Sequence, residues 1–133
     1  MRVVVAIAVA CLLASCGNGD SAQLREVQRA KSGELNIVLL SPGDSLKQGK
    51  GNAVLEFRDA RGALVDVGTV TVGASMPMAG MAPMFGDCSV MPTTMKGRYD
   101  VATNLTMAGT WRFAIAWDGP AGRGSVSMPG TAL

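Results

Sequence analysis

A dense run of methionine has the clearest chemical meaning in this sequence. Residues 76–84, MPMAGMAPM, carry four thioethers in nine positions, and the chain contains no histidine. Thioether sulfur is a soft, neutral donor that suits Cu(I). The run therefore raises a Cu(I) site as a hypothesis. Packing in an apolar core and a methionine-rich docking surface are the alternatives.

Backbone geometry decides which of these sulfur atoms share a side. The two prolines of the run fix φ and favour extended or polyproline II backbone. With three residues per turn, polyproline II would project Met78, Met81 and Met84 from one side. A plain strand would instead align Met76 with Met78 and turn Met81 away. Met107, in a glycine-containing turn before an apolar segment, is a further candidate. The candidate metal residues are Met76, Met78, Met81, Met84 and Met107, with Cu(I) as the ion.

Other side chains offer weaker chemistry. Cys88 would bind Cu(I) well only as a thiolate, and the adjacent Asp87 opposes deprotonation, so a buried and inert thiol is expected. Trp111 and Trp117 can face a cation through their rings, but their alternate positions in an apolar segment predict core packing. With no histidine, no implied carboxylate pair and no nucleophile motif, no catalytic residue is expected and the chain is predicted not to be an enzyme.

The N-terminus is typical of an exported lipoprotein. One arginine precedes an apolar run over residues 3–13, which has the length of a secretory signal and is too short to span a bilayer. Residues 13–16, LASC, resemble the bacterial lipobox. That resemblance implies a signal peptide over residues 1–15 and diacylglycerol on the sulfur of Cys16. Gly17 after the cysteine implies the outer membrane, facing the periplasm, if the host is Gram-negative.

Composition limits the partners and the domain organisation. Twelve Lys and Arg nearly balance ten Asp and Glu, and the basic residues are scattered, so no nucleic acid partner is expected. Once Cys16 is acylated, Cys88 is the single free thiol of the mature chain, so stability must come from packing. The polar residues 16–33 predict an acylated flexible tether, in which a turn or two of helix would be marginal. One domain is expected over residues 34–133.

Short apolar segments divided by Gly, Pro, Asn and Asp predict an all-β domain after the tether. Strands are expected over residues 35–40, 53–58, 64–72, 98–102, 110–117 and 124–128. Within the third, Gly68 indicates a bulge. About seven short strands in about 100 residues are typical of an immunoglobulin-like β-sandwich, with a small barrel as the competing architecture.

Several short motifs, in order, resemble one known family. They are GKGN at 49–52, RDARG at 58–62, MPMAGM at 76–81, GRY at 97–99 and MAGTW at 107–111. Together they resemble the YtkA-like/FixH-like domain over residues 35–128. The resemblance implies a small exported or membrane-tethered β-sandwich, linked in some members to copper resistance, copper efflux or cytochrome oxidase assembly. This chain departs from those relatives that carry histidine near the methionine segment, so the resemblance leaves a thioether-only Cu(I) site.

These features predict a membrane-anchored envelope lipoprotein that binds or delivers Cu(I) through its methionine-rich segment. A copper transporter of the envelope is the kind of protein partner that delivery implies. The alternative is a non-metal adaptor domain that docks onto an envelope transporter or an oxidase-assembly partner.

Overall fold

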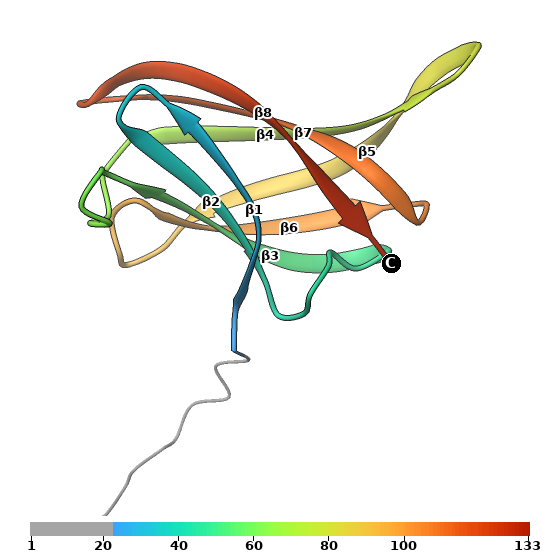
Figure 1. Cartoon of the computed structure of the whole chain (residues 1–133), viewed down its shortest axis with the longest axis horizontal. Coiled ribbons are helices and arrows are strands. Elements are labelled where there is room, and N and C mark those ends of the chain that lie inside the picture. Colours follow the sequence, from blue (N-terminus) through green and yellow to red (C-terminus); the bar gives the residue numbers. More distant parts are fainter. Residues whose placement is uncertain (1–22) are drawn as a thin grey trace, which may run out of the picture.

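The computed structural model describes residues 23–133, which form an all-β domain (Figure 1). Its strands are β1 Arg25–Ser32, β2 Leu35–Ser41, β3 Gly49–Arg58, β4 Thr69–Met78, β5 Met81–Pro92, β6 Arg98–Leu105, β7 Gly109–Gly119 and β8 Gly122–Ala132. Over these residues there is no helix of the length and apolarity needed to cross a membrane. The expected signal peptide and Cys16, the expected site of lipidation, lie outside the described residues.

Two antiparallel sheets share strand β5 and pack face to face. The hydrogen-bonded order is β1-β2-β3-β6-β5-β4-β7-β8, so β5 passes from one sheet into the other. The part of β5 from Asp87 to Pro92 pairs with β6, whereas the part before Asp87 pairs with β4. The outermost strands, β1 and β8, lie against each other. This arrangement confirms the predicted immunoglobulin-like β-sandwich, with eight strands rather than about seven.

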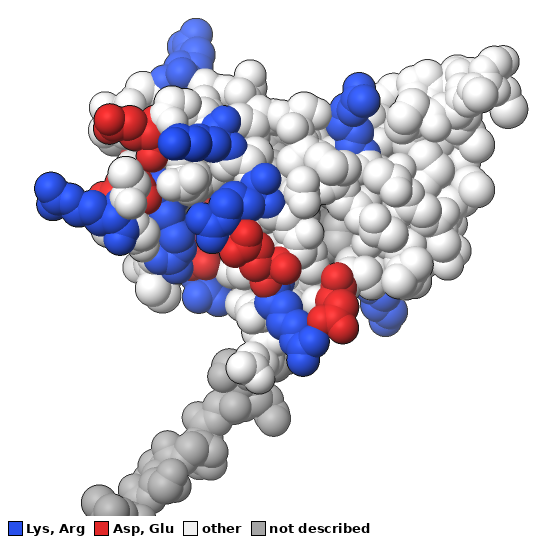
Figure 2. Space-filling model, viewed as in Figure 1, with Lys and Arg blue, Asp and Glu red and all other residues white. Residues whose placement is uncertain are grey.

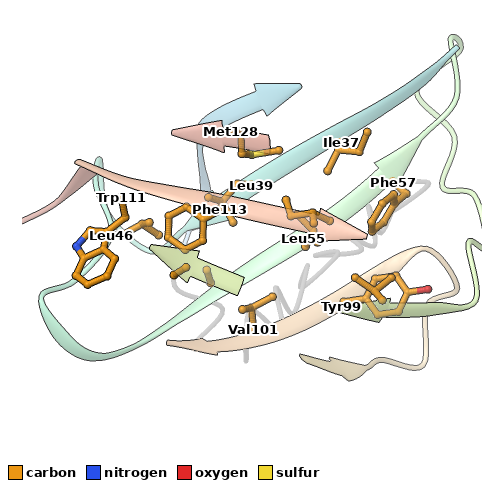
Figure 3. Packing of buried hydrophobic residues seen from close by; sticks show 14 of the residues in the cluster. Ile37, Leu39, Leu46, Leu55, Phe57, Tyr99, Val101, Trp111, Phe113 and Met128 are labelled. Atoms are coloured by element: carbon orange, nitrogen blue, oxygen red, sulfur yellow. The ribbon is translucent and has the colours of Figure 1, made fainter. Parts of the chain in front are cut away.

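Strand β7 shows how residue alternation builds the core. Trp111, Phe113, Ile115 and Trp117 alternate with exposed residues, and all four side chains are buried. From the facing sheet, Phe57 packs edge-on against Trp117 with ring centroids 5.4 Å apart. Figure 3 shows Trp111 and Phe113 among apolar side chains from several strands. The prediction that Trp111 and Trp117 belong to the core is confirmed.

Residues 25–32 differ from the sequence-based expectation of a flexible tether. They form β1, which pairs antiparallel with β2 along its whole length. The chain reverses between the two strands at Gly33, whose φ is +60°. Val27 and Ala30 are partly buried against the core. Pairing with an apolar neighbour outweighs the weak local preference of these polar residues, so the ordered domain begins before residue 34.

The strand expected over residues 64–72 has the wrong bounds. Leu64 makes an isolated bridge, and regular pairing starts only with β4. Gly68 takes φ +80°, and a Cβ there would lie 2.5 Å from the carbonyl oxygen of Asp118. The glycine therefore permits a close backbone crossing rather than a bulge inside a strand. β4 starts later than expected, and its pairing with β5 carries it through Met78 into the methionine segment.

Candidate metal centre

The methionine segment forms the end of the β4–β5 hairpin. A two-residue turn, Ala79-Gly80, joins the strands, and Gly80 takes the left-handed φ of +71° that favours glycine. The ladder of β4 with β7 ends at Ser75, and the ladder of β5 with β6 starts at Asp87. The hairpin therefore projects beyond its neighbours, as the yellow-green loop at the upper right of Figure 1 shows.

The register of this hairpin places its four thioethers on one face. Met76 pairs with Met84, and Met78 pairs with Met81. Directly opposed residues share a face of an antiparallel ladder, as do residues two apart in a strand. Between the two pairs the register shifts, because β5 contributes one residue more than β4. Without this bulge, Met81 and Met84 would lie on opposite faces, since they are an odd number of residues apart.

The structure differs in part from each of the two geometries that the sequence suggests for this segment. The backbone is a β-hairpin and not polyproline II, although Met78, Met81 and Met84 do share a side. The plain-strand alignment of Met76 with Met78 holds. Met81 does not turn away, however, because the chain reverses before it and sets it opposite Met78.

Met76 and Met84, the inner pair, are residues of the hairpin whose side chains face residues 106–109. Residues 106–108 form the turn between β6 and β7, the β6–β7 turn. Both side chains are partly buried and pack against the core. A Cβ on Gly109 would lie 3.2 Å from the Cε of Met76, so this methionine abuts the start of β7. The hydroxyl of Thr106 donates a hydrogen bond to the Sδ of Met84 over 3.2 Å. The inner pair is therefore sheltered and its surroundings are ordered by packing.

Met78 and Met81, the outer pair, lie beside the hairpin turn and are more accessible. Met81 is 70% exposed, whereas Met78 is half-buried. Met107 is exposed in the β6–β7 turn, and its carbonyl accepts a hydrogen bond from Nε1 of Trp111 over 3.0 Å. The turn that carries Met107 also carries Thr106, whose hydroxyl contacts Met84, so this turn lies against the inner pair. These placements bring the candidate methionines to one end of the sandwich.

Cys88 lies apart from the methionines. It is four residues beyond Met84 on β5, which is ~13 Å along an extended strand. Burial, and secondarily the charge of Asp87, raise the pKa of the Cys88 thiol from 9.0 to about 11. The half-buried thiol is therefore protonated at neutral pH, and a metal ion would have to displace that proton to bind there. Within residues 23–133, no group of three or more His, Cys, Asp or Glu side chains is placed to hold a metal ion.

The surroundings of the methionine face carry little charge. No charged residue occurs from Thr69 to Gly86. In Figure 2 the Lys, Arg, Asp and Glu side chains gather away from the hairpin, and the hairpin end is largely white. A neutral, partly desolvated donor set disfavours a divalent cation more than a monovalent one, because it supplies no compensating negative charge. The arrangement therefore suits a soft monovalent ion.

Comparison with known proteins gives one sequence match and two distant structural similarities. The sequence pattern of the YtkA-like family matches residues 29–116. No curated protein matches the chain. The Lin-41 filamin domain is similar at 15% identity and a TM-score of 0.44, over 76% of this chain and 95% of that one. FetP of uropathogenic E. coli strain F11 is similar at 12% identity and a TM-score of 0.47, over 81% of this chain and 94% of that one.

Proposed function

Because this chain belongs to the YtkA-like family, we propose that it is a membrane-anchored extracytoplasmic lipoprotein that binds or delivers Cu(I). The observation that carries the proposal is the hairpin register, which sets Met76 opposite Met84 and Met78 opposite Met81 on one face. Soft, neutral sulfur donors match Cu(I) and match hard divalent cations poorly. Copper handling by some YtkA-like/FixH-like proteins is in keeping with this ion.

The hairpin also lowers the entropic cost of gathering the ligands. Strand pairing fixes the backbone at all four methionines, and packing against the core restricts Met76 and Met84 further. A flexible methionine peptide would have to order its backbone on binding, whereas this hairpin is ordered beforehand. The exposed Met81 leaves a route by which an ion can enter or pass to a partner. An envelope copper transporter is the partner class that we propose for such delivery.

A soluble chain beginning at Gly17 is suited to metal-binding experiments. It lacks the signal peptide and Cys16 but keeps all eight strands and the buried core, since these lie within residues 25–132.

For this soluble chain, we expect Cu(I) affinity that is nearly constant from about pH 5.5 to about pH 8, because thioethers carry no proton to lose. A thiolate ligand would instead gain roughly tenfold affinity per pH unit below its pKa, since each binding event would release a proton. The raised pKa of Cys88, about 11, places that whole range below the titration of the thiol. Anaerobic competition with bicinchoninate at several pH values measures the profile.

The Cys88→Ser variant is the control for this profile and should reproduce it. Excess Zn(II) should not displace Cu(I) from the chain, because thioether sulfur is a poor ligand for the harder ion. An affinity that rises steeply with pH and becomes flat in Cys88→Ser would assign the ion to the thiol instead.

The lipid anchor is a separate part of the proposal. We expect Cys16→Ser to remain unprocessed or to become soluble, because a serine oxygen cannot form the thioether link to diacylglycerol. Membrane fractionation with fatty-acid labelling of the full-length protein measures this. Cys88→Ser keeps the lipobox and should fractionate like wild type. If Cys16→Ser were still cleaved, lipid-labelled and membrane-bound, the lipobox interpretation would be wrong.

A second candidate function is protein docking without metal. The observation that favours it is the exposure of large apolar side chains on β5, at Met81, Phe85 and Met91. Exposed methionine is common on adaptable binding surfaces. An adaptor of this kind would use the apolar bulk of the hairpin and would not depend on sulfur. Substitution of methionine by leucine therefore separates the two functions.

A further inference from the structure

The position of the β6–β7 turn is fixed by the core on both sides. Leu105 precedes it and Trp111 follows it, and both side chains are fully buried. The indole Nε1 of Trp111 donates to the Met107 carbonyl over 3.0 Å. The side-chain amide of Gln48 donates to the Thr106 carbonyl over 3.4 Å. Thr106 is therefore held at a defined place relative to the hairpin.

From this place, the Thr106 hydroxyl donates to the Sδ of Met84 over 3.2 Å. A thioether sulfur has two lone pairs, so the hydrogen bond occupies one and leaves the other for a metal ion. Methionine has three rotatable side-chain bonds and adopts many orientations when nothing restrains its sulfur. The hydroxyl thus selects one orientation of Met84 before any ion arrives.

We infer that Thr106 is a positioning residue for Met84 as a metal ligand, an inference that rests on the proposed Cu(I) function. In other metal sites a group that hydrogen-bonds a metal ligand fixes the orientation of that ligand. Here the hydroxyl donates to the ligating sulfur itself, so the role assigned to it is orientation and not an increase in donor strength. In this chain the positioning group comes from the β6–β7 turn, and the ligand comes from the β4–β5 hairpin. The turn therefore belongs to the site through Thr106 as well as through Met107.

The substitution that tests this role is Thr106→Val, because valine keeps the β-branched shape and removes the hydroxyl. Loss of a group that orients a metal ligand weakens affinity by ~10-fold or more, and we expect that change here. Anaerobic Cu(I) competition with bicinchoninate, on the soluble chain from Gly17, measures it. Thr106→Ser keeps the hydroxyl and should restore most of the affinity. Thr110→Val alters an exposed threonine of β7 and should bind like wild type.

The same change in a Met84→Leu background isolates the pair. There, Thr106→Val should have no further effect, because the sulfur that accepts the hydrogen bond is already gone. Three outcomes would overturn this inference and leave the proposed function standing. They are wild-type Cu(I) affinity in Thr106→Val, an affinity of Thr106→Ser as low as that of Thr106→Val, and a loss of affinity on Thr106→Val that persists in the Met84→Leu background. Wild-type chain that binds no Cu(I) would overturn the proposed function and this inference with it.

A metal-free measurement tests the hydrogen bond itself. Hydrogen peroxide transfers an oxygen atom to a methionine sulfur and leaves water. In wild type the Thr106 hydroxyl covers one of the two lone pairs of the Met84 sulfur, so only the other is open to peroxide. Peptide mass spectrometry should therefore show faster sulfoxide formation at Met84 in Thr106→Val than in wild type. Met91, which is exposed elsewhere on β5, should oxidise at the same rate in both. Equal rates at Met84 would contradict the hydrogen bond.

Discussion

We expect Trp111→Ala to destabilise the domain by ~3–5 kcal/mol, which is the usual cost of truncating a buried large aromatic residue. Trp111 is 0% exposed and begins the row of core side chains on β7. A Cβ on Gly86 would lie 3.2 Å from its Cζ3 atom, so the ring fills the space beside β5. The substitution also removes the donor to the Met107 carbonyl. A domain with a total stability of ~5–15 kcal/mol would lose a large share of it.

Urea denaturation followed by circular dichroism measures this loss. Phe85→Ala is the matched control, because Phe85 is a large aromatic residue that is 74% exposed on the hairpin. Its truncation should change the free energy of unfolding by no more than ~0.5 kcal/mol. A Trp111→Ala chain that unfolds at the wild-type urea concentration but no longer binds Cu(I) would make Trp111 part of a metal site rather than of the core.

The parts of the fold that sequence predicts well are those where burial and local pattern agree. In β7, apolar and exposed residues alternate from Trp111 to Trp117, and a strand with one buried face is the structure that this alternation predicts. β1 carries no such signal, because its residues are mostly polar and its pairing with β2 supplies the stabilisation. A strand stabilised by its neighbour in this way is found only once the sheet is known.

Sequence identifies the candidate metal residues better than it predicts their geometry. Soft-donor chemistry singles out the methionines at 76–84 without any structure. Their common face depends on the register of β4 with β5 and on the bulge between the two methionine pairs, which the sequence pattern does not reveal. One local signal for the hairpin was present, since Gly80 sits between two apolar stretches at the second position of a two-residue turn. Thr106 had none, because 22 residues separate it from Met84.

The second large effect concerns the methionines themselves. We expect replacement of Met76, Met78, Met81 and Met84 by leucine to weaken Cu(I) binding by more than ~100-fold, since it removes ligands and not merely a group that orients them. Leucine is close to methionine in volume and apolarity, and such exchanges usually cost less than ~1.5 kcal/mol each. Met81 is exposed and Met78 is only half-buried, so the cost of exchange falls mainly on Met76 and Met84 and the hairpin should stay folded, which an unchanged circular dichroism spectrum would verify.

Two controls accompany this variant. Met91→Leu/Met95→Leu exchanges two exposed methionines outside the hairpin tip and should bind Cu(I) like wild type. Cys88→Ser removes the only cysteine in the described residues and should also bind like wild type. A docking surface would tolerate all three variants, because each keeps the apolar bulk of the hairpin.

Anaerobic competition for Cu(I) between bicinchoninate and the soluble chain, with and without the four hairpin substitutions, tests the central claim most directly. We predict tight binding by the wild-type chain, loss of that binding in the four-leucine variant, and retention of it in both controls. Equal Cu(I) affinity in the wild-type and four-leucine chains would contradict a metal site at the hairpin.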